Sequence, residues 1–471
     1  MNSRGFIGRK AELEFLESIL HGRALRTCAI FGRRRIGKST LIEAFCMGKR
    51  SICIEFIQTS ESDNLDILSK MMSVAIGAPR QYSDLNQALD DISAYCKEAP
   101  TVVAFDEYPY LVDTTPGASD RLKLFIDQGL SNSDSMLIVC GSSISKLQKE
   151  ISDESRPLYG RFIRQIELSP MTYSECAEFH PNMSDIDRVM LYLTLGGIPE
   201  YHAMAQWDSY RECVSRLFLG NLAMLSREVE NIVNKELSPA GKHIAVLNAI
   251  AGGATSLKEI SSRAGFNEAS CIMYIRNLMS IRLIEKVHPM IGAPKGPNYR
   301  ISDNVAAFRY EVMGSYSASL GTRVESVFNE LEPAIRTFLG RRFEPMCMEY
   351  IRQNYVCKEI GQWWGRVDGE HVDIDIIASI LNDGIKYTLF AECKFRKKAM
   401  GFGAYNDLIR RSAAVKGNSN DIYMLFSISG FESELADYAE ENGVLLVDMD
   451  TLIGSNDPPR IRRVRRNRRG S

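Results

Sequence analysis

The sequence predicts an α/β protein of several domains, and three features of the chain lead to this prediction. Near-continuous apolar runs, typical of strands buried in a parallel sheet, alternate with helical patterns in the N-terminal third. Helical patterns dominate the middle, and two strand-like runs joined by Asp-Gly follow in the last third. A chain of 471 residues is also too long for one ordinary domain. The predicted parts are a parallel-sheet α/β core in 1–170, a helical lid in 171–236, a winged helix in 237–310, a second α/β domain in 311–455 and a disordered arginine-rich tail in 456–471.

The segment Cys28–Thr40 carries the most specific motif, Gly-x-x-x-x-Gly-Lys-Ser, which is the P-loop signature. An apolar run precedes it and a helical pattern follows it, which is the strand–loop–helix context that the motif requires. Gly37 lets backbone N–H groups approach phosphate oxygens without a Cβ in the way. Lys38 can reach the β- and γ-phosphates, and the Ser39 hydroxyl can ligate Mg²⁺. The sequence therefore predicts a bound nucleoside triphosphate here.

A second apolar run, 101–105, ends in the acidic pair Asp106-Glu107. Ligands bind at the carboxyl edge of a parallel sheet, and such a run suits a strand of that kind. We expect Asp106 to hold Mg²⁺ and Glu107 to orient or deprotonate the attacking water. Without the P-loop upstream, the same pair would be the solvated end of a strand.

Four further residues leave alternatives open. Ser142 and Ser143 follow another buried strand, where a hydroxyl could sense the γ-phosphate or cap the next helix. Arg161 lies in a Pro-Leu-Tyr-Gly-Arg loop and is a candidate arginine finger, either in cis or from a neighbouring subunit of a homo-oligomer. Arg9, just before a predicted helix, either lies near the nucleotide or is an ordinary solvated arginine.

Five motifs occur in one order along residues 5–310: GRRRIGKST, VVAFDEYPYL, CGSS, PLYGR and LGGIPEY. This combination resembles the archaeal-type ATPases, P-loop proteins of the STAND group related to AAA+ ATPases. The resemblance implies that Asp106 and Glu107 form the Walker B pair and that Arg161 is a candidate finger. It also implies ATP binding through Gly37, Lys38, Ser39 and Thr40, in a loop whose other nucleotide-contacting residues are Gly32, Arg33, Arg34, Arg35 and Ile36.

Composition sets limits on the class of protein. A hydrophobic content of 45 %, a charged content of 25 % and a net charge of −2 are those of a soluble globular protein with no overall attraction to nucleic acid or membrane. No apolar stretch reaches the ~18 residues of a membrane span. The 11 cysteines are scattered without paired spacing, as expected for buried thiols in a reducing cytoplasm.

Residues 238–303 are predicted to form a winged helix. Ser256-x-x-Glu259 is a capping box that opens its second helix, and Asn267 can cap the third. Strands near 283–288 and 299–301 would form the wing, with Lys295 in the loop between them. The third helix offers only Arg276 as a cation, so its function is either DNA binding or docking to another domain or partner.

The last third contains two strand-like runs, 372–380 and 387–395, on either side of Asp383-Gly384. Asp-Gly between such runs predicts a two-residue hairpin turn. Pairing the strands symmetrically about this turn places Asp375 opposite Glu392 and Asp373 opposite Lys394. Two facing carboxylates repel each other, and a divalent cation between them relieves the repulsion.

This D…ExK pattern resembles that of the PD-(D/E)XK nucleases. The resemblance implies that Asp375 and Glu392 bind Mg²⁺ and that Lys394 orients water or stabilises charge on the scissile phosphate. It also implies that Glu344, on a preceding helix, is a further acidic ligand. Residues 320–455 also resemble the uncharacterised, nuclease-like domain commonly fused to archaeal-type ATPases. The alternative is a solvated sheet face with a lysine–aspartate pair.

Two other features bear on nucleic acid. The tail Arg460–Arg469 contains seven arginines and can neutralise several phosphates, although a simply solvated tail is the alternative. Trp363 and Trp364 can stack on bases but favour the core. We therefore expect DNA as a partner of the C-terminal domain and the tail. Two hypotheses follow: an ATP-hydrolysing switch coupled to a metal-dependent nuclease-like domain, or a STAND-type regulatory ATPase whose C-terminal domain is a catalytically silent scaffold that binds nucleic acid or protein.

Overall fold

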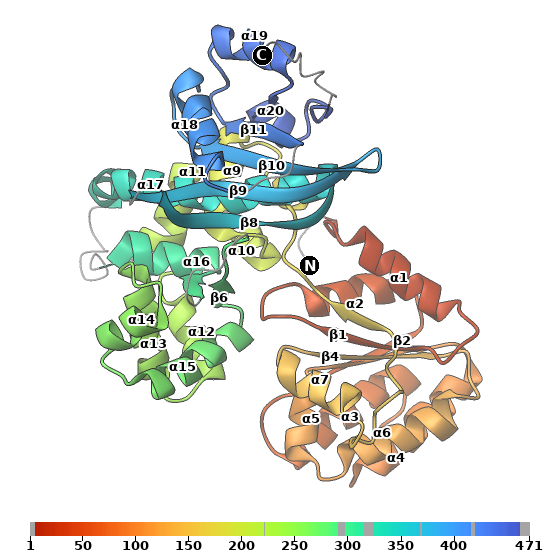
Figure 1. Cartoon of the computed structure of the whole chain (residues 1–471). Coiled ribbons are helices and arrows are strands. Elements are labelled where there is room, and N and C mark those ends of the chain that lie inside the picture. Colours follow the sequence, from red (N-terminus) through yellow and green to blue (C-terminus); the bar gives the residue numbers. More distant parts are fainter. Residues whose placement is uncertain are drawn as a thin grey trace. The chain divides into compact units, whose positions relative to one another are not determined.

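The computed structural model describes residues 5–220, 222–290, 297–314, 324–367, 370–415 and 420–461 (Figure 1). They form two compact units, the first made of 1–179 with 197–204 and the second of 180–196 with 205–471. The chain therefore passes between the units three times. The predicted lid, 171–236, is helical but does not form one body, because its residues 197–204 belong to the first unit. There the backbone N–H of Met171 donates to the Gly197 carbonyl at 2.7 Å.

The first unit is built on a five-stranded parallel sheet with strand order β2-β3-β4-β1-β5, which confirms the predicted parallel sheet. The three central strands are buried along their whole length, as their uninterrupted apolar sequences predicted. Figure 1 shows α1 and α2 on one side of this sheet and α3 to α7 on the other. The strands are β1 (Thr27–Phe31), β2 (Ser51–Glu55), β3 (Val102–Asp106), β4 (Met136–Gly141) and β5 (Gln165–Glu167). The helices are α1 (Lys10–Leu20), α2 (Lys38–Cys46), α3 (Glu61–Ile76), α4 (Leu85–Glu98), α5 (Tyr108–Thr114), α6 (Ala118–Leu124), η1 (Phe125–Leu130), α7 (Ile144–Ser152), α8 (Tyr173–Ala177) and α10 (Pro199–Met204).

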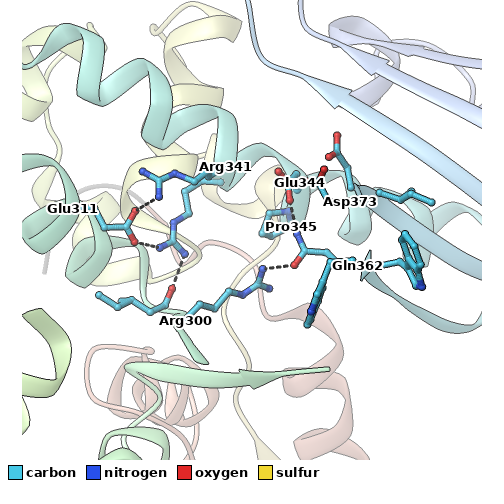
Figure 2. A pocket seen from close by; sticks show the side chains of 13 residues that line it. Arg300, Glu311, Arg341, Glu344, Pro345, Gln362 and Asp373 are labelled. Atoms are coloured by element: carbon cyan, nitrogen blue, oxygen red, sulfur yellow. Dashed lines mark hydrogen bonds and ion pairs between the residues drawn. The ribbon is translucent and has the colours of Figure 1, made fainter. Parts of the chain in front are cut away.

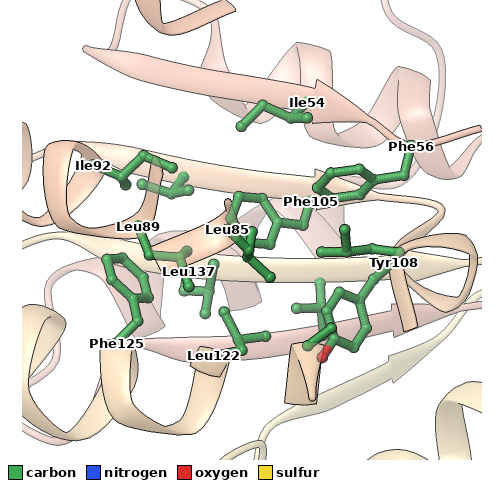
Figure 3. Close-up of a cluster of buried hydrophobic side chains, with 14 of the residues drawn as sticks. Ile54, Phe56, Leu85, Leu89, Ile92, Phe105, Tyr108, Leu122, Phe125 and Leu137 are labelled. Atoms are coloured by element: carbon green, nitrogen blue, oxygen red, sulfur yellow. The ribbon is translucent and has the colours of Figure 1, made fainter. Parts of the chain in front are cut away.

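Phe105 of β3 lies at the centre of the core on one face of this sheet (Figure 3). Its ring meets Phe56 edge to face, with 5.5 Å between the ring centroids. Leu85 and Leu89 of α4 and Phe125 of η1 pack against the same cluster. This core packs against the sheet whose carboxyl edge carries the loops of the predicted site.

The middle of the chain, in the second unit, contains three consecutive helices followed by an antiparallel pair of strands, β6 and β7. This is the element order of the predicted winged helix. Ser256 and Glu259 form the predicted capping box, and Asn267 accepts from the Ser270 N–H. The elements of this part are α9 (Asp185–Leu195), α11 (Tyr210–Val214), η2 (Ser215–Leu219), α12 (Glu228–Glu236), α13 (Ala240–Ala251), α14 (Leu257–Ala264), α15 (Glu268–Ser280), β6 (Ile284–Val287), β7 (Asn298–Ile301), α16 (Asn304–Ala307) and η3 (Phe308–Met313).

The C-terminal part is a separate mixed sheet with strand order β12-β11-β10-β9-β8. Helix α17 packs on one face, where Phe343 meets Phe395 and Tyr350 meets Phe426. Helices α18 and α19 cover the other face (Figure 1). The elements are α17 (Val324–Asn354), β8 (Val356–Val367), β9 (Glu370–Asn382), β10 (Ile385–Lys394), α18 (Phe402–Ser412), β11 (Asp421–Ser427), α19 (Ser433–Asn442), β12 (Leu445–Asp448) and α20 (Met449–Leu452).

The predicted hairpin about Asp383-Gly384 is confirmed. Both turn residues have positive φ, 49° and 74°, as a two-residue hairpin turn of the favoured type requires. The β9–β10 ladder runs in the predicted register from Asn382–Ile385 to Ile376–Ala391.

Some predictions lie outside the described residues. These are Lys295 of the wing loop and the tail arginines 462, 463, 465, 466, 468 and 469. None of the helices in the described ranges is long and apolar enough to cross a membrane.

Candidate functional site

The P-loop connects the end of β1 to the start of α2 at the carboxyl edge of the first sheet. Gly37 precedes the helix with φ 90°, a conformation that glycine adopts without strain. The Lys38 amine donates to the carbonyls of Gly32 and Arg33 at 3.0 and 3.1 Å. The amine therefore lies inside the loop, where phosphate oxygens can replace those two carbonyls as its partners.

The predicted Walker B residues lie at the carboxyl end of β3, where Asp106 is the last residue of the strand and Glu107 follows it. The Ser39 hydroxyl donates to Asp106 Oδ2, and the Glu107 N–H donates to Asp106 Oδ1 at 2.8 Å. A hydroxyl and a carboxylate in direct contact offer the oxygen ligands that Mg²⁺ prefers. Ser39 and Asp106 therefore fit the magnesium that P-loop ATPases use.

Glu107 is held by the next strand of the sheet. Its φ of 48° turns the chain sharply after β3, and its carboxylate accepts from the Ser142 N–H and hydroxyl at 3.1 and 3.0 Å. Ser143, which precedes α7, makes no side-chain capping bond. The Ser142 hydroxyl is thus bound to the predicted catalytic carboxylate, and a role toward the γ-phosphate stays a prediction.

The arginines of the P-loop point to neighbouring elements. Arg34 donates to the Tyr110 hydroxyl at 2.8 Å. Arg35, at φ 68°, forms an ion pair with Glu200 of α10 and lies 5.9 Å from the centre of the Tyr201 ring. Sequence reasoning used the LGGIPEY motif only for its resemblance to a family and missed that Glu200 within it reaches the P-loop.

Arg9 supports the P-loop from behind. Its side chain is 5 % exposed and donates to the carbonyls of Ile36 and Ser169 at 3.3 and 2.7 Å. Its backbone N–H donates to Glu175 at 3.1 Å. The alternative of an ordinary solvated arginine is wrong, because Arg9 is buried and contacts the P-loop through the Ile36 carbonyl. A position near the bound nucleotide stays a prediction.

Arg161 lies at the opposite edge of the sheet from the P-loop. Its carbonyl accepts from the Thr27 hydroxyl at the amino end of β1, and its guanidinium pairs with Asp127 at 2.9 Å. The arginine finger in cis is therefore wrong, because the length of β1 separates Arg161 from the phosphate-binding edge. A role toward a neighbouring subunit stays a prediction.

In the C-terminal sheet, a β-bulge lies beside the acidic residues of β9. Gly361 of β8 pairs with Ile377 of β9 and Trp363 pairs with Ile374, so β9 carries one extra residue between them. Bulges of this kind redirect side chains. The β9–β10 ladder ends at the Ile376–Ala391 pair. The predicted pairs Asp375–Glu392 and Asp373–Lys394 lie beyond this end and are not part of the ladder.

Asp375 and Glu392 have different partners. Asp375 Oδ2 accepts from the backbone N–H of Cys393 at 2.8 Å. Glu392 is 2 % exposed and forms ion pairs with Lys394 and, at 2.6 Å, with Arg411 of α18. Sequence reasoning missed Arg411, since no local pattern ties a helix residue to a strand that precedes it.

Glu344 lies on α17, as predicted, and accepts from the Gln362 amide at 2.5 Å. Burial, together with the charge of Asp375, raises the pKa of Glu344 to about 8. Burial and the charge of Glu392 raise the pKa of Asp375 to about 6. Across the part of the chain that is described, no three His, Cys, Asp or Glu side chains are grouped so that they could hold a metal ion. Glu344, Asp375 and Glu392 therefore do not form a preassembled three-carboxylate site.

Comparison with known proteins finds a family match for each of two separate segments of the chain. Residues 6–204 match the family described as an ATPase domain predominantly from Archaea. Residues 308–403 match a family described as archaeal and bacterial proteins of unknown function. An uncharacterised protein of Methanocaldococcus jannaschii is 29 % identical over 463 residues, covering 94 % of this chain and 99 % of that protein.

Among solved structures, a Walker-type ATPase of Pyrococcus abyssi is similar with a TM-score of 0.50 and 18 % identity, covering 65 % of this chain and 96 % of that one. An ORC2 protein of Aeropyrum pernix, solved with ADPNP and ADP, gives a TM-score of 0.44 and 14 % identity over 71 % of this chain and 97 % of that one. The first likeness supports the fold. Together with the family match and the P-loop geometry, it identifies the N-terminal part of the chain as an archaeal-type P-loop ATPase domain.

Proposed function

We propose that this protein is an ATP-hydrolysing switch coupled to a metal-dependent, nuclease-like C-terminal domain that acts on DNA. The observation that carries the proposal is the occurrence of two sets of polar side chains in one chain. Ser39, Asp106 and Glu107 gather beside the P-loop, and Asp375 meets the Glu392-x-Lys394 segment through the Cys393 amide.

For the ATPase step, Lys38 would exchange its two carbonyl partners for β- and γ-phosphate oxygens. Ser39 and Asp106 would hold Mg²⁺, which neutralises phosphate charge when bound. Glu107 would accept a proton from the attacking water, and Ser142 fixes the position of its carboxylate. The short contacts among these residues support this assignment because each group already lies within reach of the next.

For the nuclease step, Asp375 and Glu392 would hold a divalent cation that supplies Lewis-acid activation of a phosphodiester. Lys394 would stabilise negative charge on the scissile phosphate. Its amine already lies beside a buried carboxylate, and its pKa is raised by the charge of Glu392 although burial acts in the opposite direction. Lys394 thus stays a cation at neutral pH, as charge stabilisation requires.

Coupling between the two steps is proposed to run through α10. This helix belongs to the first unit, yet the residues before and after the 197–204 segment belong to the second. Glu200 pairs with Arg35 in the loop that contacts the nucleotide. A change at the P-loop that moves Arg35 would therefore move the 197–204 segment, and with it both of the points at which this segment connects to the second unit. The arginine-rich tail would add sequence-independent attraction to nucleic acid.

One observation favours a second candidate function, a regulatory ATPase whose C-terminal domain is a silent scaffold. Glu392 is already neutralised by two cations, Lys394 and Arg411. A buried carboxylate so paired is satisfied without a metal ion. In this alternative the same residues only stabilise the sheet.

A cleavage assay tests the first proposal against the second. Plasmid and short duplex DNA are incubated with the full chain and Mg²⁺ or Mn²⁺, with and without ATP, beside Lys394→Ala. Lys386→Ala is the matched control, because Lys386 is exposed on the same strand, β10. We expect cleavage by the wild type and by the control, and none by Lys394→Ala. An absence of cleavage under every condition would refute the nuclease.

A further inference from the structure

A cavity of about 520 Å³ opens beside Asp375 in the second unit (Figure 2). It lies where β7 and η3 of the middle part meet α17, β8 and β9 of the C-terminal part. Neither Glu392 nor Lys394 lines it. Its lining is Arg300, Ile301, Glu311, Arg341, Arg342, Glu344, Pro345, Gln362, Trp363, Trp364, Asp373, Ile374 and Asp375.

The cavity has a cationic end. Arg341 and Arg342 both approach Glu311, at 3.5 and 3.3 Å, so that two guanidinium groups share one carboxylate. Arg342 is nearly buried and also donates to the Ile301 carbonyl at 2.9 Å. Arg341 is 60 % exposed and makes only the longer of the two ion pairs. Its guanidinium therefore has donors to offer a ligand phosphate.

The other end is acidic, and Figure 2 shows Glu344 and Asp373 away from the arginine pair. Asp375 completes this end, and its carboxylate also meets the backbone between Glu392 and Lys394. The carboxylates of Asp373 and Asp375 would repel an anion placed at this end unless it brought a cation with it. The distribution of charge therefore suits a phosphate-bearing ligand associated with a divalent cation.

A chain of polar contacts runs along the cavity from β7 to the acidic end. Arg300 of β7 pairs with Glu285 at 2.6 Å and donates to Gln362 at 3.2 Å, and Gln362 donates to Glu344. The backbone N–H of Met290, just beyond β6, donates to the Gln362 carbonyl at 3.0 Å. The region predicted as a wing thus docks on β8 and supplies one wall of the cavity.

The two tryptophans of β8 differ in their environment. Trp363 is 9 % exposed and belongs to the core beneath the sheet. Trp364 is half-buried, lines the cavity and does not belong to that core. A half-exposed indole beside a charged cavity offers a flat surface on which a base can stack.

We propose that this cavity binds one unpaired nucleotide of a DNA strand, with its phosphate at Arg341 and its base against Trp364. A volume of about 520 Å³ is typical of sites for small molecules. A duplex, whose major groove alone is about 12 Å wide, does not fit such a cavity, whereas an extruded nucleotide does. This inference rests on the proposed function in one respect, because Asp375 belongs both to the cavity and to the proposed nuclease site. It adds that the nuclease site acts on single-stranded DNA.

The test measures binding by fluorescence anisotropy, using a labelled short single strand and a hairpin duplex of the same composition. Full-length protein is titrated in Ca²⁺, so that binding is observed separately from cleavage, and again in EDTA. Because the tail attracts both probes, the ratio of the two affinities is the quantity compared. We expect the single strand to bind at least about tenfold more tightly in Ca²⁺, and this preference to weaken in EDTA.

The variants are chosen to separate the cavity from the rest of the chain. Arg341→Ala and Trp364→Ala should each weaken single-strand binding about tenfold. Arg336→Ala is the matched control, because Arg336 is an exposed arginine on the same helix whose partner is Glu332. Trp364→Phe should restore binding, since a phenyl ring also stacks. Arg341 is largely exposed, so its variant tests the proposal even if Trp364→Ala fails to fold.

Equal affinity for the two probes, or equal binding by Arg341→Ala and Arg336→Ala, would overturn the cavity proposal. This failure is distinct from failure of the nuclease. If Lys394-dependent cleavage occurs while the cavity variants bind normally, the nuclease stands and the cavity proposal falls. If selective single-strand binding occurs without cleavage, the cavity proposal stands and the nuclease falls.

Discussion

Arg35 of the P-loop forms an ion pair with Glu200 of α10, and its guanidinium lies 5.9 Å from the centre of the Tyr201 ring. The pair joins residues 165 positions apart within the first unit. Their side chains are 29 % and 45 % exposed, so the pair contributes only about 0–1 kcal/mol to stability. Its importance lies in its position, between the phosphate-binding loop and the short helix that connects to the second unit at both ends.

Breaking this pair should weaken the coupling between ATP and DNA while leaving the protein folded. Arg35→Gln and Glu200→Gln should each bring the ratio of DNA affinities with and without ATP closer to one. The double variant should behave like either single variant, because both remove the same interaction. Glu98→Gln, which breaks the Arg50–Glu98 pair in the same unit, is the control. Additive effects would argue against transmission through the pair.

Glu107→Gln should lower ATP turnover by about 100-fold or more while ATP still binds, since only the proton acceptor is lost. Ser142→Ala removes one of the two hydrogen bonds to that carboxylate and should lower turnover about 3- to 10-fold. Steady-state turnover and equilibrium binding of ATP are measured together. Unchanged turnover by Glu107→Gln would remove Glu107 from the mechanism.

Glu344→Gln should stabilise the protein more at high pH than at low pH. The pKa of Glu344 is raised to about 8 from an ordinary value of 4.5, so the folded state keeps a proton that the unfolded state releases. The unfolding free energy of the wild type therefore falls as pH rises from about 5 to 8. Glutamine does not titrate, so the gain from the substitution should grow over that range to the order of several kcal/mol.

Urea unfolding in EDTA at pH 5.5 and pH 8.5 measures this gain. Glu330→Gln, at an exposed position on the same helix, is the control for the substitution itself. An equal gain from Glu344→Gln at both pH values would contradict the raised pKa.

Gly197→Ala should destabilise the packing of the 197–204 segment in the first unit. A Cβ at this position would lie 2.1 Å from the Met171 carbonyl oxygen, so the backbone must shift. Overpacking of this kind costs about 1–3 kcal/mol. Gly403→Ala in α18 is the control, because its Cβ meets nothing within 4 Å and alanine favours the helix. Thermal unfolding of both variants is the measurement. A lower unfolding temperature for Gly197→Ala but not for Gly403→Ala would show a steric effect rather than a general effect of replacing glycine.

The ATPase half was predictable because its chemistry is local in sequence. The P-loop residues are consecutive, and Asp106 and Glu107 come at the end of a strand that its apolar sequence identifies. The hairpin was predictable for the same reason, since Asp383-Gly384 fixes both the turn and the register. Arg161 was misplaced because its motif gives no information on which edge of the sheet its loop lies.

The details of the C-terminal site were not predictable, because they depend on long-range packing. The extra residue in β9 shows only in its pairing with β8, a strand that local patterns did not reveal. Arg411 and Gln362 reach the acidic residues from a helix and a strand with no sequence motif of their own. The cavity itself exists only where the middle and C-terminal parts meet.

The most direct test of the account compares DNA affinity with and without ATP in the wild type, in Lys38→Ala and in Glu107→Gln. Occupancy of the P-loop is proposed to control the C-terminal domain, and couplings of this kind typically amount to about 5- to 150-fold in affinity. We predict that ATP tightens DNA binding at least about fivefold in the wild type and in Glu107→Gln, which binds ATP without turning it over, and has no effect in Lys38→Ala. Identical affinity of the wild type with and without ATP would contradict the account.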